Sequence, residues 1–329
     1  MTGIMNDPLL QVEDLHIHFQ TDDGLIKAVN GVDYDIMKGE TLGLVGESGS
    51  GKSVSALSIM GLIPQPPGRI LKGCINFDGQ DLLRLPHSKI RKVRGNAISM
   101  IFQEPMTSLN PVHRIGHQVS EVIQLHRPDE KQQAWERAIS MLGKVGIADP
   151  KRRARDYPFQ LSGGMRQRVM IAMALACNPK LIIADEPTTA LDVTIQAQIL
   201  ELMLKLQNEF KSSILLITHD LGVVAETAKW VAVMYAGQVV EYAEVREIFH
   251  NPQHPYTVAL LESIPHMDRP PPPDKILRAI PGTVPSLLDL PPGCPFQDRC
   301  LKVFDQCRQE NPPLFHLKGE RKVRCWLYG

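Results

Sequence analysis

The chain has 329 residues, more than one hydrophobic core usually requires, so we expect one large domain with an appendage, or two domains. Its 36 basic and 36 acidic side chains balance, which argues against a nucleic-acid-binding stripe or a polybasic membrane anchor. The longest apolar run, Val169 to Ala176, is far shorter than the roughly 20 residues that span a bilayer, so no membrane span is expected. Asp7 and Pro8 interrupt the stretch that a signal peptide would need, so we expect no export.

Strands and helices are predicted in a regular order. Two antiparallel strands, Leu9 to Phe19 and Lys27 to Met37, are expected on either side of the turn-prone Thr21-Asp22-Asp23-Gly24. Apolar β-rich segments then alternate with helical ones, which is typical of an α/β fold with a buried parallel sheet. The alternating segments are Thr41 to Val45 with Ser53 to Leu62, Leu181 to Asp185 with Thr194 to Phe210, and Ile214 to Thr218 with Leu221 to Thr227.

A helical insertion is expected in the middle of the chain. Between His113 and Val145 the apolar residues follow a helical period, and they share one face at Trp135, Ala138, Ile139 and Leu142. We place this insertion at about residues 104–165.

The composition changes after Ile264. Pro270 to Pro273 is a polyproline spacer, and prolines stay dense from there to Gly329 while periodicity is poor. We therefore predict a main domain at residues 1–264, and a Pro-rich linker with a small Cys-rich domain at residues 265–329.

A glycine-rich loop follows the apolar strand Leu42 to Val45 and directly precedes a helix, as the P-loop motif requires. Its glycines let the backbone turn amide N–H groups toward phosphates, and the helix N-terminus adds its positive dipole end. Lys52 supplies a charge for the β- and γ-phosphates, and Ser53 a hydroxyl for Mg²⁺. A glycine-rich turn arising by chance is the alternative, which the flanking strand and helix disfavour. The expected ATP-binding residues are Gly46, Glu47, Ser48, Gly49, Ser50, Gly51, Lys52, Ser53 and Val54.

Two carboxylates follow the buried strand Leu181 to Ala184. Asp185 is placed to hold Mg²⁺ at the carboxyl edge of a parallel sheet. Glu186 is the natural candidate to orient and deprotonate an attacking water. Alone, Asp-Glu after a strand more often marks a solvated strand end, but a P-loop upstream reverses the odds.

The segment Leu161-Ser162-Gly163-Gly164-Met165-Arg166-Gln167 opens a helical, apolar stretch that runs to Ala176. A Ser-Gly-Gly turn at a helix N-terminus can bind an anion, yet the P-loop already serves the γ-phosphate. The motif resembles the signature sequence of ABC (ATP-binding cassette) ATPases, which other P-loop families lack. The resemblance implies that Ser162, Gly163 and Gly164 close on ATP held by the P-loop of a second subunit. An ordinary Ser helix cap is the simpler alternative.

Further positions match the ABC pattern in order, so that the resemblance covers roughly Leu9 to Ser263. It implies that Phe19 stacks on adenine, and that Gln103 is the Q-loop glutamine, which senses Mg²⁺ and meets the membrane partner. Thr189-Ala190-Leu191-Asp192 resembles the D-loop, which places Asp192 at the nucleotide. His219 resembles the switch histidine that contacts the γ-phosphate. Taken alone, Phe19 fits a core residue equally well, and a lone His after a strand is usually structural.

The resemblance implies an ATPase in which Glu186, His219, Gln103 and Lys52 serve hydrolysis. Because one chain offers one P-loop and one signature, a second ABC subunit, identical or paralogous, must complete each site. The implied partners also include two transmembrane permease subunits and, indirectly, an extracytoplasmic solute-binding protein. Nucleic acid is not an expected partner. We expect the chain at the cytoplasmic face of the cell membrane, as a peripheral subunit.

Three segments resemble the ATP-binding subunits of dipeptide and oligopeptide importers, so we expect ATP hydrolysis to power uptake of such peptides. They are residues 103–111 (QEPMTSLNP), residues 251–257 (NPQHPYT), and residues 280–285 (IPGTVP) with 293–296 (GCPF). Close relatives serve nickel and other small solutes, which leaves the solute open. Two other hypotheses are a soluble ABC-type ATPase outside transport, and an iron–sulfur redox protein with a vestigial nucleotide site.

Four of the six cysteines lie near the C-terminus, at Cys294, Cys300, Cys307 and Cys325. In a reducing cytosol such a group indicates metal binding rather than disulfides. Because the C-x-x-C pairs typical of structural zinc are absent, we predict a structural [4Fe–4S] cluster held by all four thiolates, with Zn²⁺ or unrelated thiols as alternatives. The expected fold class is thus α/β, a P-loop NTPase of ABC type, with an antiparallel β subdomain, a helical subdomain and a small Cys-rich C-terminal domain.

Overall fold

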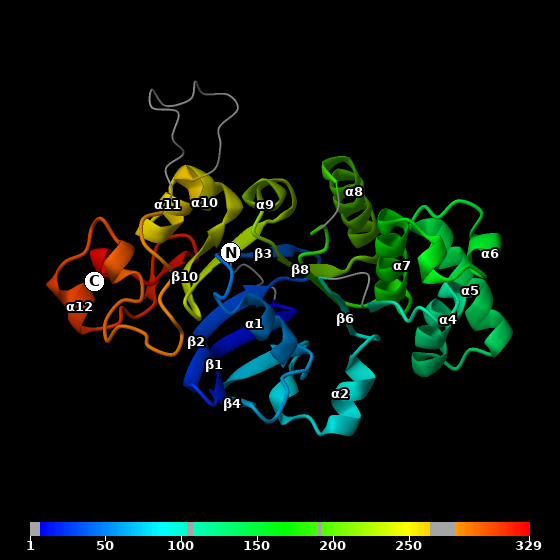
Figure 1. The fold of residues 1–329 in the computed structure, drawn as a ribbon, viewed down its shortest axis with the longest axis horizontal. Coiled ribbons are helices and arrows are strands. Elements are labelled where there is room, and N and C mark those ends of the chain that lie inside the picture. The colour runs from blue at the N-terminus through cyan, green and yellow to red at the C-terminus, as the bar shows by residue number, and fades with distance from the viewer. Residues whose placement is uncertain (1–6, 104–107, 190–191, 264–279) are drawn as a thin grey trace, which may run out of the picture. The chain divides into compact units, whose positions relative to one another are not determined.

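The structure, a computed structural model, describes residues 7–103, 108–189, 192–263 and 280–329 (Figure 1). The chain forms two compact units, each of which is described here by itself. Unit 1 comprises Met1–Leu9, Ile36–Thr41 and Asp78–Thr218, and unit 2 comprises Leu10–Asp35, Leu42–Phe77 and His219–Gly329. Each unit is therefore assembled from segments that are distant in sequence.

Unit 1 contains three parallel strands in the order β6-β7-β8. They are β6 (Ile98–Ile101), β7 (Leu181–Asp185) and β8 (Ser213–Ile217). Every residue of β7 and β8 is buried, as expected for near-continuous apolar runs covered on both faces. The carboxyl ends of these strands lie at one edge, where Ile101 is in register with Ala184, and Asp185 with Ile217.

Helices make up most of the rest of unit 1. They are α2 (His87–Val93), α4 (Ile115–His126), α5 (Lys131–Lys144), α6 (Pro150–Arg153), α7 (Gly163–Leu175) and α8 (Val193–Phe210), with a short strand β5 (Gln80–Asp81) before them. The single helical stretch expected between residues 113 and 145 is two helices. The break falls at Arg127, which is extended because Pro128 follows it. Of the residues predicted to share one face, Ala138 and Leu142 are fully buried in α5, whereas Trp135 and Ile139 are half-buried.

Unit 2 contains an antiparallel set of strands in the order β2-β1-β4. They are β1 (Leu10–Thr21), β2 (Gly24–Ile36) and β4 (Gly68–Phe77), and β1 pairs with β4 so that Phe19 faces Gly68. The predicted turn at residues 21–24 is tighter than expected, because only residues 22 and 23 separate β1 from β2.

The second sheet of unit 2 is mixed, in the order β3-β9-β10-β12-β11. Its strands are β3 (Thr41–Val45), β9 (Trp230–Tyr235), β10 (Gln238–Glu244), β11 (Phe315–His316) and β12 (Lys322–Val323). β3 and β9 are parallel, whereas β9, β10, β12 and β11 pair antiparallel. The helices are α1 (Lys52–Ile59), α9 (Leu221–Thr227), α10 (Val245–His250), α11 (Pro255–Glu262) and α12 (Asp305–Gln309). The predicted parallel pairing is present between β3 and β9, and the antiparallel strands β10, β12 and β11 extend it.

The C-terminal residues share a core with the strand that leads into the P-loop. Phe296 is 2% exposed and belongs to the same hydrophobic cluster as Val45, Tyr235 and Tyr256. The strand β12 pairs with β10, with Glu241 in register with Val323. The predicted boundary between residues 264 and 265 lies outside the described residues and stays a prediction.

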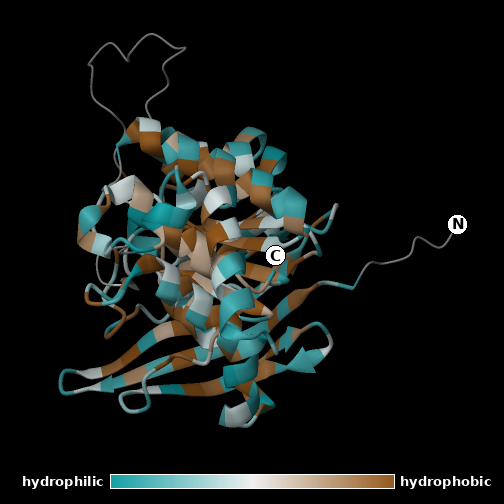
Figure 2. Ribbon diagram, turned by 90° about the vertical axis from the view of Figure 1, so that its right-hand side faces the viewer, coloured by the Kyte–Doolittle hydropathy of each residue, from teal (hydrophilic) through white to brown (hydrophobic). Residues whose placement is uncertain are grey.

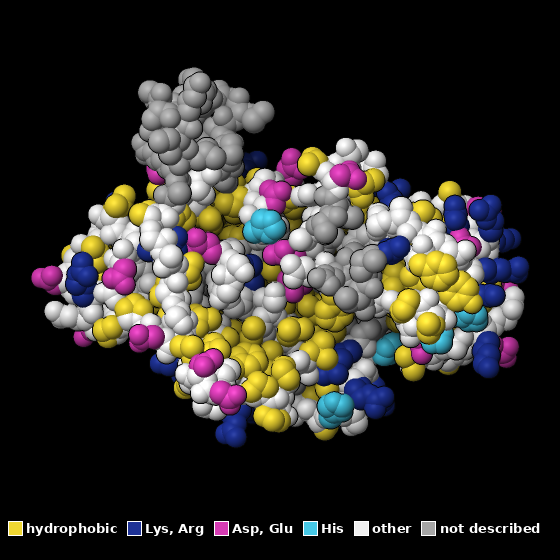
Figure 3. All heavy atoms as spheres, in the orientation of Figure 1, with side chains coloured by type: hydrophobic (Ala, Val, Ile, Leu, Met, Phe, Trp, Pro, Cys, Tyr) yellow, Lys and Arg dark blue, Asp and Glu magenta, His cyan; other side chains and the backbone are white. Residues whose placement is uncertain are grey.

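Hydropathy and charge follow the predicted pattern. Hydrophobic ribbon segments gather in the interior and hydrophilic ones on the outside of helices (Figure 2). On the face drawn in Figure 3, Lys and Arg side chains lie among Asp and Glu side chains, as the balanced composition predicts. Among the helices of the described ranges, none has the length and apolar character of a membrane span.

Candidate active site

The P-loop, residues 46–53, connects β3 to α1. Two of its glycines have φ values that other residues rarely adopt, 149° at Gly46 and 97° at Gly51. A Cβ atom would lie 2.1 Å from the carbonyl oxygen of Met234 at the first position, and 2.3 Å from that of Ala28 at the second. The loop is therefore folded closely against neighbouring backbone, which only glycine permits at these two positions.

Lys52 begins α1 and is 7% exposed, with its ammonium group directed into the loop. It donates hydrogen bonds to the carbonyl oxygens of Gly46 (2.8 Å) and Glu47 (2.9 Å) and to the Ser50 hydroxyl (3.3 Å). All three acceptors belong to the loop, so the ammonium group lies within it, where the P-loop interpretation places the phosphates. Ser53 follows in the first turn of α1 and is half-buried.

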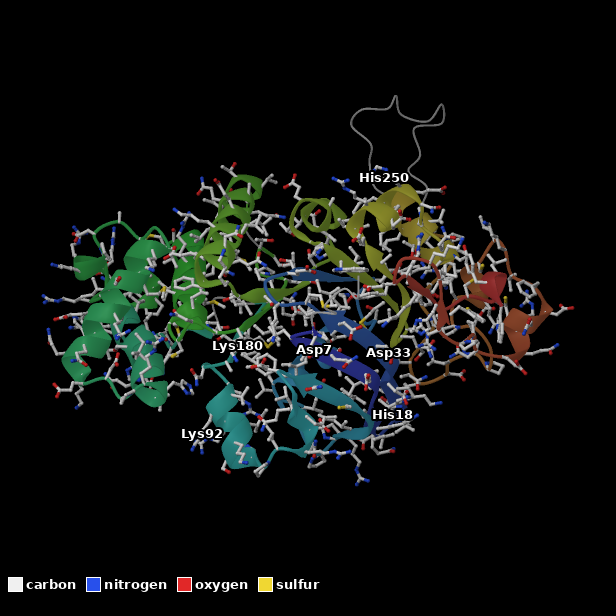
Figure 4. The ribbon with its side chains drawn as sticks, turned by 180° about the vertical axis from the view of Figure 1, so that it is seen from behind. Asp7, His18, Asp33, Lys92, Lys180 and His250 are labelled. Carbon is white, nitrogen blue, oxygen red and sulfur yellow. The ribbon has the colours of Figure 1, made fainter. Side chains whose placement is uncertain are left out.

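Phe19, the residue assigned to adenine, lies near the end of β1 and is half-buried. Its ring atom Cε1 would be 2.8 Å from a Cβ atom at Gly68, so the ring rests against the β4 backbone. His18 and Gln20 alternate with Phe19 along β1 and face the other side, where they line a groove of about 530 Å³. Figure 4 labels His18. The part of Phe19 that stays exposed is available for stacking.

The acidic end of β7 carries a strained residue. Glu186 has φ of 46°, in the left-handed region, and its N–H donates to the Ile217 carbonyl oxygen (2.9 Å). Its Oε2 atom accepts hydrogen bonds from the side-chain amide of Gln103 (3.2 Å) and the hydroxyl of Thr189 (2.8 Å). Such a conformation costs about 1–3 kcal/mol and persists where surrounding bonds fix it. The carboxylate of Glu186 is thus held in one orientation.

Asp185 ends β7 and is 7% exposed. Gln103 follows β6 closely, so the parallel arrangement of β6 and β7 brings Asp185, Glu186 and Gln103 to one sheet edge. The structure therefore unites these three predicted residues within unit 1.

The signature residues form the start of α7. Ser162 caps the helix by accepting a hydrogen bond from the Met165 N–H (3.4 Å), so the plain capping interpretation is correct as far as it goes. Gly163 and Gly164 make up the first turn, and a Cβ atom at Gly164 would lie 2.9 Å from Cγ2 of Ile195. At Gly164 the first turn therefore packs closely against Ile195 of α8.

One hydrogen bond relates this helix to the acidic strand end, and another caps α8 at the D-loop. The Gln167 side chain donates to the carbonyl oxygen of Pro187 (2.5 Å), directly after Glu186. Asp192 caps α8 by accepting from the Ile195 N–H (2.9 Å). The other D-loop residues, 190 and 191, lie outside the described residues, as do residues 104–107 of the predicted Q-loop segment.

His219 lies in the connection from β8 to α9 and is exposed. The next residue, Asp220, caps α9 by accepting from the N–H groups of Gly222 (2.9 Å) and Val223 (3.2 Å). The cap fixes the backbone beside His219 while its imidazole stays accessible.

The four C-terminal cysteines line one small pocket, together with Phe296 and His254. The N–H of Cys294 donates to the carbonyl oxygen of Cys307 (2.7 Å). Burial raises the pKa of the Cys294 thiol to about 12 and that of Cys325 to about 11, and the neighbouring thiols add to both shifts. Each thiolate would therefore require a cation or a cluster to stabilise it.

The predicted metal site is not confirmed. Within residues 7–103, 108–189, 192–263 and 280–329, no three His, Cys, Asp or Glu side chains are placed to hold one metal ion. This finding concerns the zinc alternative most directly, because Zn²⁺ needs its ligands to converge on a single atom.

Comparison with known proteins places this geometry in a family. The model of the ABC transporter family matches residues 29–189, and that of the oligopeptide/dipeptide transporter C-terminal region matches residues 240–307. The oligopeptide transport ATP-binding protein AppD of Bacillus subtilis (strain 168) is 55% identical over 320 residues, 97% of this chain and 97% of the relative. This chain belongs to the ABC transporter family.

Other relatives agree. The dipeptide transport ATP-binding protein DppD of Escherichia coli (strain K12) is 51% identical over 318 residues, 96% of each chain. Among solved structures, the dimeric ATP-binding cassette MJ0796 in a post-hydrolysis state bound to ADP and Pi matches with a TM-score of 0.64 and 28% identity, over 72% of this chain and 99% of that one. The predicted ABC-type fold and the ATPase activity are thereby confirmed.

Two residues of this ABC ATPase, Thr189 and Tyr256, escaped the sequence analysis as individuals, and for Arg299 the contact that the structure shows was not predicted. Thr189 orients Glu186, and the D-loop motif already contained it. The hydroxyl of Tyr256 accepts a hydrogen bond from the N–H of Glu47 (3.0 Å). Tyr256 belongs to the NPQHPYT segment, which the sequence analysis used only for its resemblance to peptide importers. Arg299 contacts Glu47 from a distance of 252 positions, for which no local pattern gives a signal.

Proposed function

We propose that this chain powers the uptake of dipeptides or oligopeptides through a membrane ABC importer. One observation carries the proposal: the similarity to the peptide transport ATP-binding proteins AppD and DppD runs along almost the whole chain, and includes the transporter-specific C-terminal region. An ATPase outside transport would need only the cassette itself. The substrates are those in the relatives' names, and nickel or another small solute is the competing cargo.

Nucleotide binding is assigned to the P-loop and to Phe19. The amide N–H groups of residues 46–51 and the N-terminus of α1 would bind the phosphates, with Lys52 adding its charge. Ser53, Asp185 and Gln103 have the oxygen ligands that Mg²⁺ prefers, and Mg²⁺ would neutralise charge on the β- and γ-phosphates. The half-exposed ring of Phe19 would stack on adenine.

Hydrolysis is assigned to Glu186 as the base. Its carboxylate is held by Gln103 and Thr189, so it would take a proton from a water without first having to reorient. His219 is accessible in the loop after β8 and would donate to the γ-phosphate. The two hydrogen bonds to Glu186 would also let this carboxylate hold a water in position.

A second cassette is required by this scheme. Ser162, Gly163, Gly164 and Asp192 would contact ATP held by a partner's P-loop, and the similar cassette MJ0796 is dimeric. We propose that the dimer sits peripherally at the cytoplasmic face of the membrane, with two permease subunits as separate polypeptides. An extracytoplasmic solute-binding protein would deliver the peptide.

Uptake of radiolabelled di- and tripeptides tests the proposal in cells that lack this chain. Wild-type chain should restore uptake, and Glu186→Gln should not. If the wild-type chain restores uptake of nickel but not of peptides, nickel replaces peptides as the cargo. If it changes the uptake of neither solute, the transport assignment is wrong. Recovery of two multi-span subunits after affinity purification from membranes would identify the permease.

We also propose that the four C-terminal cysteines hold a [4Fe–4S] cluster. All four line one pocket, and a [4Fe–4S] cluster takes one thiolate on each of its four irons. When bound, the cluster would supply the cationic irons that stabilise buried thiolates. The chain's own part is to position Cys294, Cys300, Cys307 and Cys325 and to exclude water from them.

Iron, sulfide and zinc analysis of anaerobically purified protein decides this point. About four irons and four sulfides per chain, with visible absorbance, would support the cluster. One zinc per chain without absorbance would replace it with the zinc alternative, and neither metal would leave four structural thiols. The matched control is the variant Cys74→Ser, which removes a cysteine outside the pocket and should change none of these contents.

A further inference from the structure

The second residue of the P-loop, Glu47, is held by residues far along the chain. Its two carboxylate oxygens accept hydrogen bonds from the two terminal nitrogens of Arg299, at 2.8 and 3.1 Å. Its backbone N–H donates to the Tyr256 hydroxyl (3.0 Å), and its carbonyl oxygen accepts from Lys52 (2.9 Å). Every polar group of Glu47 is therefore engaged, and two of its partners come from after residue 250.

Arg299 is itself fixed in place. Its side chain is 5% exposed, and its Nε atom donates to the carbonyl oxygen of Pro281 (2.9 Å). One terminal nitrogen also donates to the Tyr235 hydroxyl (3.2 Å), and the guanidinium lies over the rings of Tyr235 and Phe296. A planar guanidinium held by these hydrogen bonds and ring contacts presents its fork in one direction.

The negative charge of Glu47 gives a reason for its ion pair with Arg299. A carboxylate in a phosphate-binding loop has the same sign as the phosphates and would repel them. The Glu47 side chain is 29% exposed, so solvent screens this repulsion only in part. A bidentate guanidinium cancels the charge and leaves that of Lys52 to act on the nucleotide.

We infer that Arg299 is a positioning residue of the nucleotide site, which holds Glu47 and neutralises its charge beside the bound phosphates. The C-terminal region thereby forms part of the ATPase rather than an appendage to it. The inference rests on the proposed role of the P-loop, and the experiment below separates the two.

The test measures the dissociation constant of MgATP on the purified full-length chain, for wild type, Arg299→Met, Glu47→Gln and the double variant. Arg299→Met should bind MgATP about tenfold more weakly, because the Glu47 carboxylate is left uncompensated. Adding Glu47→Gln should restore most of the lost MgATP affinity, because the carboxylate that repels the phosphates is gone. A merely structural role for Arg299 predicts no such rescue.

Arg308→Met is the matched control. Arg308 is exposed, and it follows Cys307 in the sequence just as Arg299 directly precedes Cys300. It should bind MgATP like wild type. If Arg299→Met does not fold, Arg299→Lys replaces it, with an expected loss of about threefold because Lys cannot form both bonds. That loss should likewise be relieved by Glu47→Gln.

Wild-type affinity in the Arg299 variants, or a loss that Glu47→Gln does not relieve, would overturn the inference. Lys52→Ala separates this failure from failure of the P-loop proposal. If Lys52→Ala binds MgATP normally, the P-loop site is wrong and the inference falls with it. If Lys52→Ala loses binding while Arg299→Met keeps it, only the inference is wrong.

Discussion

The side-chain amide of Gln103 donates a 3.2 Å hydrogen bond to Glu186, 83 positions away in the sequence. The Thr189 hydroxyl donates to the same carboxylate oxygen at 2.8 Å. Because both donors bind the same carboxylate oxygen, they hold the Glu186 side chain in one orientation.

Glu186→Gln should therefore reduce ATP turnover by about 10²- to 10⁴-fold, since an amide of the same shape cannot accept the proton. MgATP binding should persist, and the nucleotide-bound dimer should accumulate. Phosphate release and size-exclusion chromatography measure the two effects. Glu201→Gln, on the exposed face of α8, is the control and should retain normal turnover. Normal turnover in Glu186→Gln would place the base elsewhere.

Lys52→Ala should weaken MgATP binding by about tenfold or more, because the charge inside the P-loop is lost. The variant also loses the three hydrogen bonds that Lys52 makes to Gly46, Glu47 and Ser50, so the melting temperature of the protein should fall slightly. Equilibrium titration with a fluorescent ATP analogue measures the affinity. Lys205→Ala removes an exposed lysine of α8 and should change neither quantity. Unchanged affinity in Lys52→Ala would count against the P-loop assignment.

Gly51→Ala should destabilise the chain more than Gly49→Ala. Both glycines have positive φ, 97° and 78°, so both alanines carry a similar backbone strain of about 1–3 kcal/mol. Only at Gly51 would the new Cβ meet a backbone atom, the Ala28 carbonyl oxygen at 2.3 Å, while nothing lies within 4 Å at Gly49. Thermal unfolding of the two variants isolates the clash. Equal melting temperatures would mean that the loop relaxes freely at Gly51.

The sequence was informative wherever function and local structure coincide. The strands before the P-loop and before Asp185 and His219 are short apolar runs, and the chemistry-bearing residues follow directly at their ends. A pattern of this kind is local, because strand, turn and helix preferences depend on neighbouring residues. The same is true of the glycines at Gly46 and Gly51, which the P-loop motif requires.

The contacts made by the C-terminal region were beyond such reasoning. β11 and β12 have two residues each, too few for any period, and they become strands only because β10 offers a paired edge. The Arg299–Glu47 contact joins residues 252 positions apart, so it depends on the tertiary fold alone. The positive φ of Glu186 is also imposed by its surroundings, since glutamate has no preference for it.

The pairing of Arg321 with two different carboxylates leads to the last prediction. Arg321 is 6% exposed and donates to Glu241, which is fully buried at 0% exposure, at 2.8 Å. It also donates to Glu247, whose side chain is 52% exposed, at 3.1 Å. Arg321 therefore takes part in one buried and one solvent-exposed ion pair, whose contributions to stability can be compared in the same protein.

Glu241→Gln should destabilise the chain by about 3–5 kcal/mol, because it removes the buried partner of the Arg321 charge and leaves only the solvent-exposed Glu247 to offset it. An amide also has only one acceptor oxygen, whereas the two Glu241 oxygens accept the N–H groups of Gln253 and His254 as well as Arg321. The Gln NH₂ group would therefore face another donor, whichever way it is turned. Glu247→Gln should cost less than about 1 kcal/mol, because water screens that pair.

Urea unfolding of the two variants at equal ionic strength measures the difference. The variant Glu241→Leu with Arg321→Met removes both buried charges and should regain the part of the stability that is lost through the broken ion pair, while the N–H groups of Gln253 and His254 still lose their acceptor. If Glu241→Gln and Glu247→Gln lose the same stability, the buried pair contributes no more than the exposed one. In that case β12 would be held on β10 by backbone pairing and the packing around Val323 rather than by Arg321.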